Sequence, residues 1–558
     1  MKLTNPFLIL SMLCFAGTSC GDFLERSAQD LKIPVTTRDY KEILQGEAYF
    51  KDVSNTGNFI NYMTDDVEFF SAVNLAEDAN RKDWSEQASY LTSSYFATYD
   101  RCYFWDQEIE TEFTDEFFKQ LYHQILIANL CLDAVDDTDG TDDEKEILRG
   151  QAAFHRALAY FYLANTYAKP FNEAQSSDLC VPIKNETTTT TATFARNTVG
   201  EVWTLINNDI RTALDNLDGK DIASAYEVNH KAALIVASRI ALFQEDYSQA
   251  ILYGEEFLTK YGATNGLYDI SMQDRANNPA SNTTTNNSDA AVVNFFTRSN
   301  TEIVLSWGNF TYPVQAIDYN TAIGWRTSAP IDENALGSYL VAPNLTNSAE
   351  YEAKTLIGQY NFSITRGANG IIASVTGDRR PVYWFIAPRP YTGVTSVRSR
   401  YNYYVMKSDR SYDFSVCYNF PNVIRTGEVY LNLAEAYARR NSGGDAAKAI
   451  QYLNDLREKR IAPYAGTSEE LASTTFASNS ELVQFVWNER RRELCFEEFH
   501  RWWDLRRTGQ PKIVHKWYEQ TYTLQDHDPN YVLDFPIAER EYNGAKLVPN
   551  VRYAKTPD

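Results

Sequence analysis

Two stretches of the sequence combine aromatic rings with charged and amide side chains. A sugar presents a flat C–H face and a rim of hydroxyl groups, so a sugar site needs rings that cover the face and polar groups that bond the rim. The first stretch runs from Arg81 to Tyr99, and the second runs from Phe310 to Arg326. We predict that the ligand-binding side chains are Trp84, Tyr90, Tyr312, Tyr319, Asn320, Trp325 and Arg326.

Each of these rings could instead pack in the interior, where Trp and Tyr are common. Trp105 lies just before a helical segment, and Trp502 and Trp503 lie within another, so these three side chains are predicted to be structural. Trp84 and Trp325 are the strongest candidates for ligand contact.

Several patterns that are typical of catalytic centres are missing from the sequence. It contains no H-E-x-x-H, G-x-G-x-x-G or Walker motif, and its six histidines are scattered. The adjacent pair Asp65 and Asp66 could act as the general acid and base of a glycosidase. A solvated turn is the commoner setting for such a pair, so we predict that the protein is not an enzyme.

Metal binding is also disfavoured. The sequence has no Cys-x-x-Cys motif and no close group of Cys and His, so no zinc site is expected. Residues 136–140 resemble a calcium loop only superficially, because the glycine and the later glutamate are wrongly placed. No metal and no cofactor is predicted, and mostly buried thiols are expected at Cys102, Cys131, Cys180, Cys417 and Cys495.

The balance of charge limits the possible partners. The chain of 558 residues has a formal net charge of −22, and its acidic residues are spread along the sequence, which disfavours binding to the phosphates of nucleic acid. Hydrophobic residues make up 44% of the chain, which is enough for a substantial core.

Residues 1–19 have the features of an export signal. Lys2 precedes an apolar run from Phe7 to Ala16 that is too short to span a bilayer stably. Small residues then precede Cys20 in the manner of a bacterial lipobox, so Cys20 is predicted to become an acylated N-terminus. Two or more acyl chains there would hold the protein at a membrane, whereas ordinary secretory cleavage is the alternative.

The spacing of apolar residues predicts helices over most of the mature chain. Residues 39–52 and 111–136 are expected to be helical, the second with apolar residues three and four positions apart. Residues 141–144 form a predicted capping box for a helix that ends at Lys169, before Pro170, and residues 201–217 predict a further helix.

Residues 231–261 and 430–460 resemble each other. Each contains an Ala-rich helix, a polar break and a second helix with the pattern Ala-Ile-x-Tyr. With the preceding helices, we expect four helical pairs that stack as tetratricopeptide repeats do; an irregular helical domain is the alternative. The predicted fold class is therefore mostly α, a tetratricopeptide-like helical-hairpin scaffold with a loop-rich, irregular insertion.

The insertion is predicted over residues 262–425. This stretch is rich in Gly, Pro, Asn and aromatic residues, and only short runs resemble strands. Loops on a rigid scaffold are a suitable place for recognition. Residues 187–191 form another polar loop, which we interpret as a connector.

Residues 488–509 have the unusual sequence NERRRELCFEEFHRWWDLRRTG. We predict a helix that continues from Leu482 through this segment. Unpaired buried charges are costly, so ion pairs are expected to involve Glu489, Arg490, Arg492 and Glu493.

This segment closely resembles the C-terminal signature of the SusD/RagB family of lipid-anchored, nutrient-binding proteins of Gram-negative outer membranes. The family pattern has Gly near Glu498 or Phe499, so the turn there is expected to differ locally. Further blocks resemble SusD-like sequences in the expected order, namely residues 152–167, 196–203, 378–380, 424–436 and 535–537.

The resemblance implies a surface-exposed outer-membrane lipoprotein, anchored in lipid through Cys20. Such a protein would bind an oligosaccharide and deliver it, as a lid, to a SusC-like TonB-dependent transporter. Peptide capture by the same scaffold is an alternative, as are an exported glycoside hydrolase and a solenoid that serves only as a protein scaffold.

The predicted boundaries follow from these features. They are a signal peptide at 1–19, a lipidated tether at 20–38, an N-terminal helical part at 39–261 with a ligand loop near 60–105, the ligand-binding insertion at 262–425, and a C-terminal hairpin and signature region at 426–558.

Overall fold

The computed structural model describes a large part of the chain. The described residues are 33–49, 57–69, 100–110, 114–271, 295, 300–307, 325–327, 362–366, 372–380, 384–386, 404–405, 422–462, 470–517 and 520–558. The predicted signal peptide lies outside them, as do Cys20, Trp84, Tyr90, Tyr312, Tyr319, Asn320 and Cys417.

Helices dominate the described residues, so the predicted mostly-α fold class is confirmed. The α-helices are α2 (Thr37–Glu47), α4 (Asp100–Tyr103), α5 (Glu116–Ala134), α6 (Asp142–Tyr167), α7 (Val199–Leu217), α8 (His230–Phe243), α9 (Tyr247–Tyr261), α12 (Thr426–Arg440), α13 (Asp445–Glu458), α14 (Asn479–Leu494), α15 (His500–Arg507) and α16 (Ile537–Asn543). The short 3-10 helices are η3 (Asn58–Met63), η6 (Val135–Asp137), η7 (Phe171–Glu173), η14 (Ser473–Thr475), η15 (Pro529–Tyr531) and η16 (Gly544–Lys546).

Capping side chains set where the helices begin. The Thr141 and Glu144 side chains form the predicted capping box of α6. The Asp115 side chain accepts hydrogen bonds from the backbone N–H groups of Phe117 and Phe118, so α5 begins at Glu116, later than predicted. Helix α2 ends at Glu47 and is shorter than expected.

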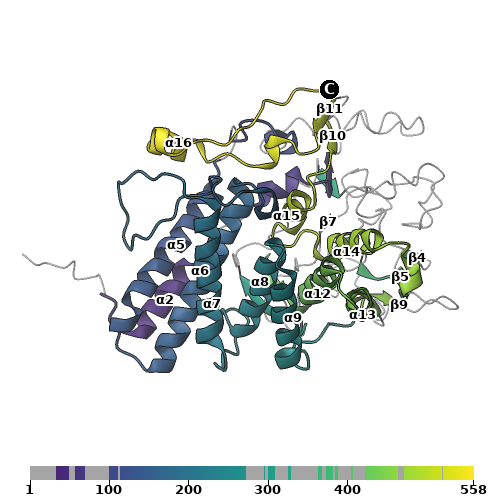
Figure 1. The fold of residues 1–558 in the computed structure, drawn as a ribbon, viewed down its shortest axis with the longest axis horizontal. Helices are drawn as coiled ribbons and strands as arrows, with labels where there is room; N and C mark the ends of the chain where they lie inside the picture. Colours follow the sequence, from purple (N-terminus) through teal and green to yellow (C-terminus); the bar gives the residue numbers. More distant parts are fainter. Residues whose placement is uncertain are drawn as a thin grey trace, which may run out of the picture.

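The helices form a continuous stack of neighbours. Each packs on the next, from α5 through α6, α7, α8 and α9 to α12, which also contacts α13 and α14. Figure 1 shows this series side by side, from α2, α5, α6 and α7 at one end to α12, α13 and α14 at the other. The predicted pairs at 231–261 and 430–460 are the hairpins α8–α9 and α12–α13.

A close approach joins the two similar hairpins. A Cβ atom at Gly254 in α9 would lie 2.8 Å from the side chain of Leu433 in α12, which only a glycine avoids. The small residue therefore allows α9 and α12 to pack tightly, as expected of stacked hairpins.

One large hydrophobic core runs through the stack. It includes Trp105, Trp502 and Trp503, whose side chains are fully or almost fully buried, so their predicted structural role is confirmed. Trp203 and Trp307 lie in the same core.

The strands are short and form small sheets. They are β1 (Val67–Phe69), β2 (Ile303–Trp307), β3 (Trp325–Thr327), β4 (Phe362–Arg366), β5 (Ile372–Asp378), β6 (Phe385–Ile386), β7 (Tyr404–Val405), β8 (Asn422–Arg425), β9 (Ile461–Ala462), β10 (Ile513–Trp517) and β11 (Gln520–Leu524). The pairings are all antiparallel: β1 with β3, β10 with β11, β2 with β8, β5 with both β4 and β9, and β6 with β7.

The predicted single helix through the arginine-rich segment is wrong. Helix α14 ends at Leu494 and α15 begins at His500. Between them, Phe496 and Glu498 adopt left-handed backbone conformations, with φ of 58° and 45°. The break turns the Glu497 and Glu498 carboxylates toward Arg425 and Arg239, which gives each buried carboxylate an ionic partner.

The four described cysteines confirm the expectation of buried thiols. They are Cys102, Cys131, Cys180 and Cys495, and each is buried. Within the part of the chain that the structure describes, no helix has both the length and the apolar character that crossing a membrane requires.

Candidate ligand-binding site

The two regions predicted to bind ligand meet in a short antiparallel ladder. Strand β1 pairs with β3, so that Phe69 lies opposite Trp325 and Glu68 lies opposite Arg326. Strand β1 belongs to the region near residues 60–105, and β3 belongs to the central insertion. Of the seven predicted ligand-binding residues, the structure describes the backbone of Trp325 and Arg326, and the other five lie outside the described residues.

Two ion pairs, one half-buried and one buried, hold the segment that leads into β1. The Arg501 guanidinium binds both carboxylate oxygens of Asp65 at 2.7 Å, and Arg491 Nε donates to Asp66 Oδ1 at 2.6 Å. Asp66 is only 1% exposed. The predicted solvated turn at this pair is therefore wrong, because two arginines from α14 and α15 bind the carboxylates.

These contacts change the electrostatics of the pair. Burial alone would raise the pKa of Asp65, but Arg491 and Arg501 lower that pKa below its usual range. Burial raises the pKa of Asp66. Asp65 is thus an ionised anchor with both of its oxygens bound, which is a poor arrangement for a general acid or base.

An aromatic stack also contacts this segment. The His515 ring lies between those of Tyr103 and Trp105, with centroids 4.0 and 4.1 Å away. Its Nδ1 and Nε2 lie 2.8 and 3.1 Å from the carbonyl oxygens of Tyr103 and Thr64. The Trp105 indole N–H donates to the Met63 carbonyl at 2.8 Å. Sequence reasoning missed His515, since no local pattern links it to residues 63–64.

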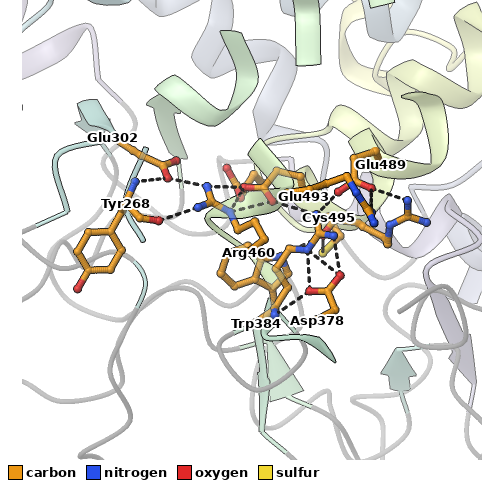
Figure 2. Close-up of polar contacts among 12 residues, drawn as sticks. Tyr268, Glu302, Asp378, Trp384, Arg460, Glu489, Glu493 and Cys495 are labelled. Atoms are coloured by element: carbon orange, nitrogen blue, oxygen red, sulfur yellow. Dashed lines mark hydrogen bonds and ion pairs between the residues drawn. The ribbon is translucent and has the colours of Figure 1, made fainter. Parts of the chain in front are cut away.

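A second group of buried charges lies where the insertion meets the helices. Glu493 accepts hydrogen bonds from Arg425 at 2.8 Å and Arg380 at 3.2 Å. It also accepts one from Arg460 at 3.0 Å (Figure 2). All four side chains are at most 1% exposed. Burial would raise the pKa of Glu493, but the three arginines lower it below its usual range. The ion pairs predicted for the segment of residues 488–509 are confirmed.

The network extends to two points within the insertion. Glu302, just before β2, binds Arg425 at 2.9 Å and Arg460 at 2.5 Å. At the end of β5, Asp378 binds Arg380 through both oxygens. Three of the sequence blocks that resemble the SusD/RagB family thus converge at this point, namely residues 378–380, 424–436 and 488–509.

Two further contacts tighten this junction. The Trp384 indole N–H donates to the Arg492 carbonyl at 3.0 Å, and the Trp384 side chain is fully buried. A Cβ atom at Gly427 would lie 3.1 and 3.2 Å from carboxylate oxygens of Glu302 and Glu493, so a glycine gives the charges room to approach. These blocks therefore form the frame that positions the insertion.

In the ranges that the structure describes, no three or more Cys, His, Asp and Glu side chains are grouped so that they could hold a metal ion. In the segment that superficially resembles a calcium loop, the Asp136 carboxylate binds Arg149 instead.

Known protein families match both halves of the chain. A family described as "SusD family" matches residues 385–550, and a family described as "Starch-binding associating with outer membrane" matches residues 22–242. A SusD-like protein of Formosa agariphila is 24% identical over 431 residues, which cover 72% of this chain and 73% of that protein.

Solved structures share the fold. A SusD superfamily protein of Bacteroides vulgatus has a TM-score of 0.61 at 16% identity, over 93% of this chain and 99% of that one. A SusD-like carbohydrate binding protein of the same organism has a TM-score of 0.54 at 19% identity, over 91% of this chain and 97% of that one.

Proposed function

Because this chain belongs to the SusD-like family, we propose that it binds a glycan at the outer membrane and delivers it, uncleaved, to a SusC-like TonB-dependent transporter. The match of residues 22–242 to a family described as starch-binding and associated with the outer membrane supports both the ligand class and the location. The fold that the chain shares with a carbohydrate binding protein supports the same ligand class.

The β1–β3 ladder is the observation that carries the site assignment. It joins the region near residues 60–105 to the central insertion, so that two loop regions can contribute rings to one surface. The proposed ligand-binding residues on that surface are Trp84, Tyr90, Tyr312, Tyr319, Asn320, Trp325 and Arg326.

Delivery requires that the open and the closed lid bind the ligand with different affinities. A ligand held between this protein and the transporter closes the lid only if it binds the closed state more tightly than the open one. Acylation of Cys20 would keep the lid at the membrane through both states.

The state of the two carboxylates that could act in hydrolysis supports capture without cleavage. Asp65 and Asp66 are bound by Arg501 and Arg491, and together they anchor β1. Their role in the proposed function is to position the ladder.

Affinity electrophoresis on a panel of polysaccharides tests this proposal. Wild-type protein should be retarded by at least one glycan, and Trp84→Ala and Trp325→Ala should migrate faster in that gel. Tyr553→Ala is the control, because this exposed ring lies on the C-terminal tail and should leave the mobility unchanged.

Three results would contradict the proposal in different ways. Unchanged mobility of both Trp variants would remove the site assignment. Retardation by no glycan, together with binding to a peptide array, would favour peptide capture. Release of reducing sugar from the retarding glycan would identify a hydrolase.

A further inference from the structure

An open cavity lies on the helical scaffold, between α5, the connector after residue 183, and α16. Its volume is about 280 Å³. None of its lining residues belongs to β1, β3 or the insertion. The walls are formed by Lys119, Tyr122, His123, Leu126, Asn129, Lys184, Glu186, Thr188, Thr189, Thr190, Ala192, Phe194, Glu539, Tyr542 and Asn543.

Hydrogen bonds to the backbone hold the connector against α5 and α6. The Asn129 side-chain amide donates to the carbonyl oxygens of Lys184 and Glu186, at 2.9 and 3.1 Å. The Tyr160 hydroxyl accepts from the backbone N–H of Lys184 at 2.9 Å. The polar connector predicted at residues 187–191 is therefore fixed at its start.

The far wall is held in the same way by α16. Asn543 Oδ1 accepts from the backbone N–H of Phe194 at 2.8 Å, and the Tyr542 hydroxyl donates to the Thr191 carbonyl at 2.7 Å. Three separate segments of the chain are thus joined around one cavity. A cavity built in this way is preorganised, which lowers the entropic cost of binding.

The Lys184 ammonium is the first group that lacks a polar partner. It lies 4.5 Å from the ring centroids of both Tyr122 and Phe194, and no carboxylate or carbonyl among the described residues accepts a hydrogen bond from it. Burial lowers the pKa of Lys184. The two rings compensate only part of the hydration that the ammonium loses, so it favours an added acceptor.

The Glu186 carboxylate is the second such group. Its Oε2 atom is buried and accepts no hydrogen bond from any described residue. A buried carboxylate oxygen without a donor is costly, so this site favours an added donor. A donor and an acceptor therefore lie without partners in the walls of the same cavity.

The lining charges balance, which points to a neutral ligand. The lining contains two lysines, Lys119 and Lys184, and two glutamates, Glu186 and Glu539. A hydroxyl group both donates and accepts, so a polyhydroxylated molecule can satisfy Lys184 and Glu186 together. The Tyr542 ring is 54% exposed and offers an apolar face for a sugar ring.

We propose that this cavity is a second binding site, which takes a neutral polyhydroxylated ligand the size of one or two sugar rings. Its volume is close to the lower limit of about 300 Å³ for ligand pockets, so a longer glycan would extend outside. Lys184 donates to ligand hydroxyls, Glu186 accepts from them, and Tyr542 stacks on the ring. This site is independent of the glycan surface at the β1–β3 ladder.

Saturation-transfer NMR and calorimetry on the whole mature protein test the second site. The probes are glucose, galactose, mannose, xylose and N-acetylglucosamine, with glycine and alanine as zwitterionic alternatives. At least one sugar should bind, and Glu186→Gln, Lys184→Met and Tyr542→Ala should each weaken its binding by about fivefold or more. Tyr553→Ala, an exposed ring outside the cavity, should leave the affinity unchanged.

The Trp325→Ala variant separates the two sites. Sugar binding that survives Trp325→Ala but weakens in the cavity variants supports the second site, whatever the outcome at the ladder. Binding lost in Trp325→Ala but kept in the cavity variants would overturn it and leave the proposed function intact. Binding of the amino acids alone, or of none of the probes, would also overturn it. If Lys184→Met fails to fold, the isosteric Glu186→Gln variant decides the outcome.

Discussion

Arg239 and Glu498 form a fully buried ion pair that joins α8 to the turn between α14 and α15. Two hydrogen bonds of 2.8 and 2.9 Å link the guanidinium and the carboxylate. Arg239 also binds both oxygens of Glu428 in α12, at 2.6 and 2.7 Å. One guanidinium thus connects both similar hairpins to the arginine-rich segment, so this turn is part of the scaffold.

Substitutions at Glu498 should separate its backbone strain from its ion pair. The residue has φ of 45°, where glycine is favoured over other residues. Glu498→Ala loses the ion pair and keeps the strain, so we expect it to lower the free energy of unfolding by about 3 kcal/mol or more. Glu498→Gly loses the pair but relieves the strain, and should be about 1 kcal/mol more stable than Glu498→Ala. Urea unfolding measures both, and an Ala variant as stable as the Gly variant would contradict the account.

Removing the Arg491 side chain should weaken both stability and ligand capture. Arg491→Ala leaves the buried Asp66 carboxylate without its ion pair, which we expect to cost about 3 kcal/mol of unfolding free energy. The segment before β1 would lose an anchor, so retardation in glycan gels should also fall. Arg38→Ala is the control, because its ion pair with Glu42 is exposed and should contribute less than about 1 kcal/mol. Normal glycan retention in a folded Arg491→Ala protein would show that the ladder does not need this anchor.

The Asp115 carboxyl group should make stability fall as pH rises. Burial raises its pKa from 3.8 to about 7, although the Tyr167 hydroxyl bonds the carboxyl group. Because the folded state binds the proton more tightly, this contribution is complete below about pH 4 and is lost as pH rises through about 7. Asp115→Asn keeps the cap of α5 without titrating, so its stability relative to the wild type should increase by a few kcal/mol, on the order of 1.4 kcal/mol per pKa unit, between pH 4 and pH 8.

Thermal or urea unfolding at several pH values measures this difference. A constant gap between the wild type and Asp115→Asn would show that Asp115 titrates in its usual range. Glu144→Gln is a suitable control, because the Glu144 carboxylate also caps a helix but is exposed. Hydrogen bonds from the Thr141 backbone and side chain lower the pKa of Glu144, whereas burial raises that of Asp115.

Lipid attachment is tested at Cys20. In Cys20→Ser, no thiol is present for acylation, so the protein should move from the membrane fraction to the soluble fraction. Metabolic labelling with a fatty-acid analogue should mark the wild type alone, and Cys417→Ser should be labelled like the wild type. Labelling of the Cys20→Ser protein would place the anchor elsewhere.

Local spacing in the sequence predicted most of the scaffold helices, although not the break between α14 and α15. Apolar residues three and four positions apart indicated α5, and the Thr141–Glu144 box marked the start of α6. The repeated Ala-Ile-x-Tyr pattern identified α9 and α13, because each hairpin buries the same kind of face against its neighbour.

Long-range contacts could not be predicted in this way. Asp65 was interpreted as part of a solvated turn, the commoner setting for two adjacent carboxylates, yet its partner is Arg501, 436 residues away. The turn at Glu498 also depends on a distant residue, Arg239, which offsets a local conformation that the residue type disfavours. Of the candidate site, sequence reasoning indicated two ligand-binding regions, but not that β1 and β3 join them.

The β1–β3 ladder also sets an order of assembly. Its strands are separated by most of the helical stack along the chain, so closing the loop between them carries a large entropic cost. The hairpins α5–α6 and α8–α9 form from neighbouring residues and need no such closure. We therefore expect the ladder to form after these hairpins, as must the still longer-range contact between Asp65 and Arg501.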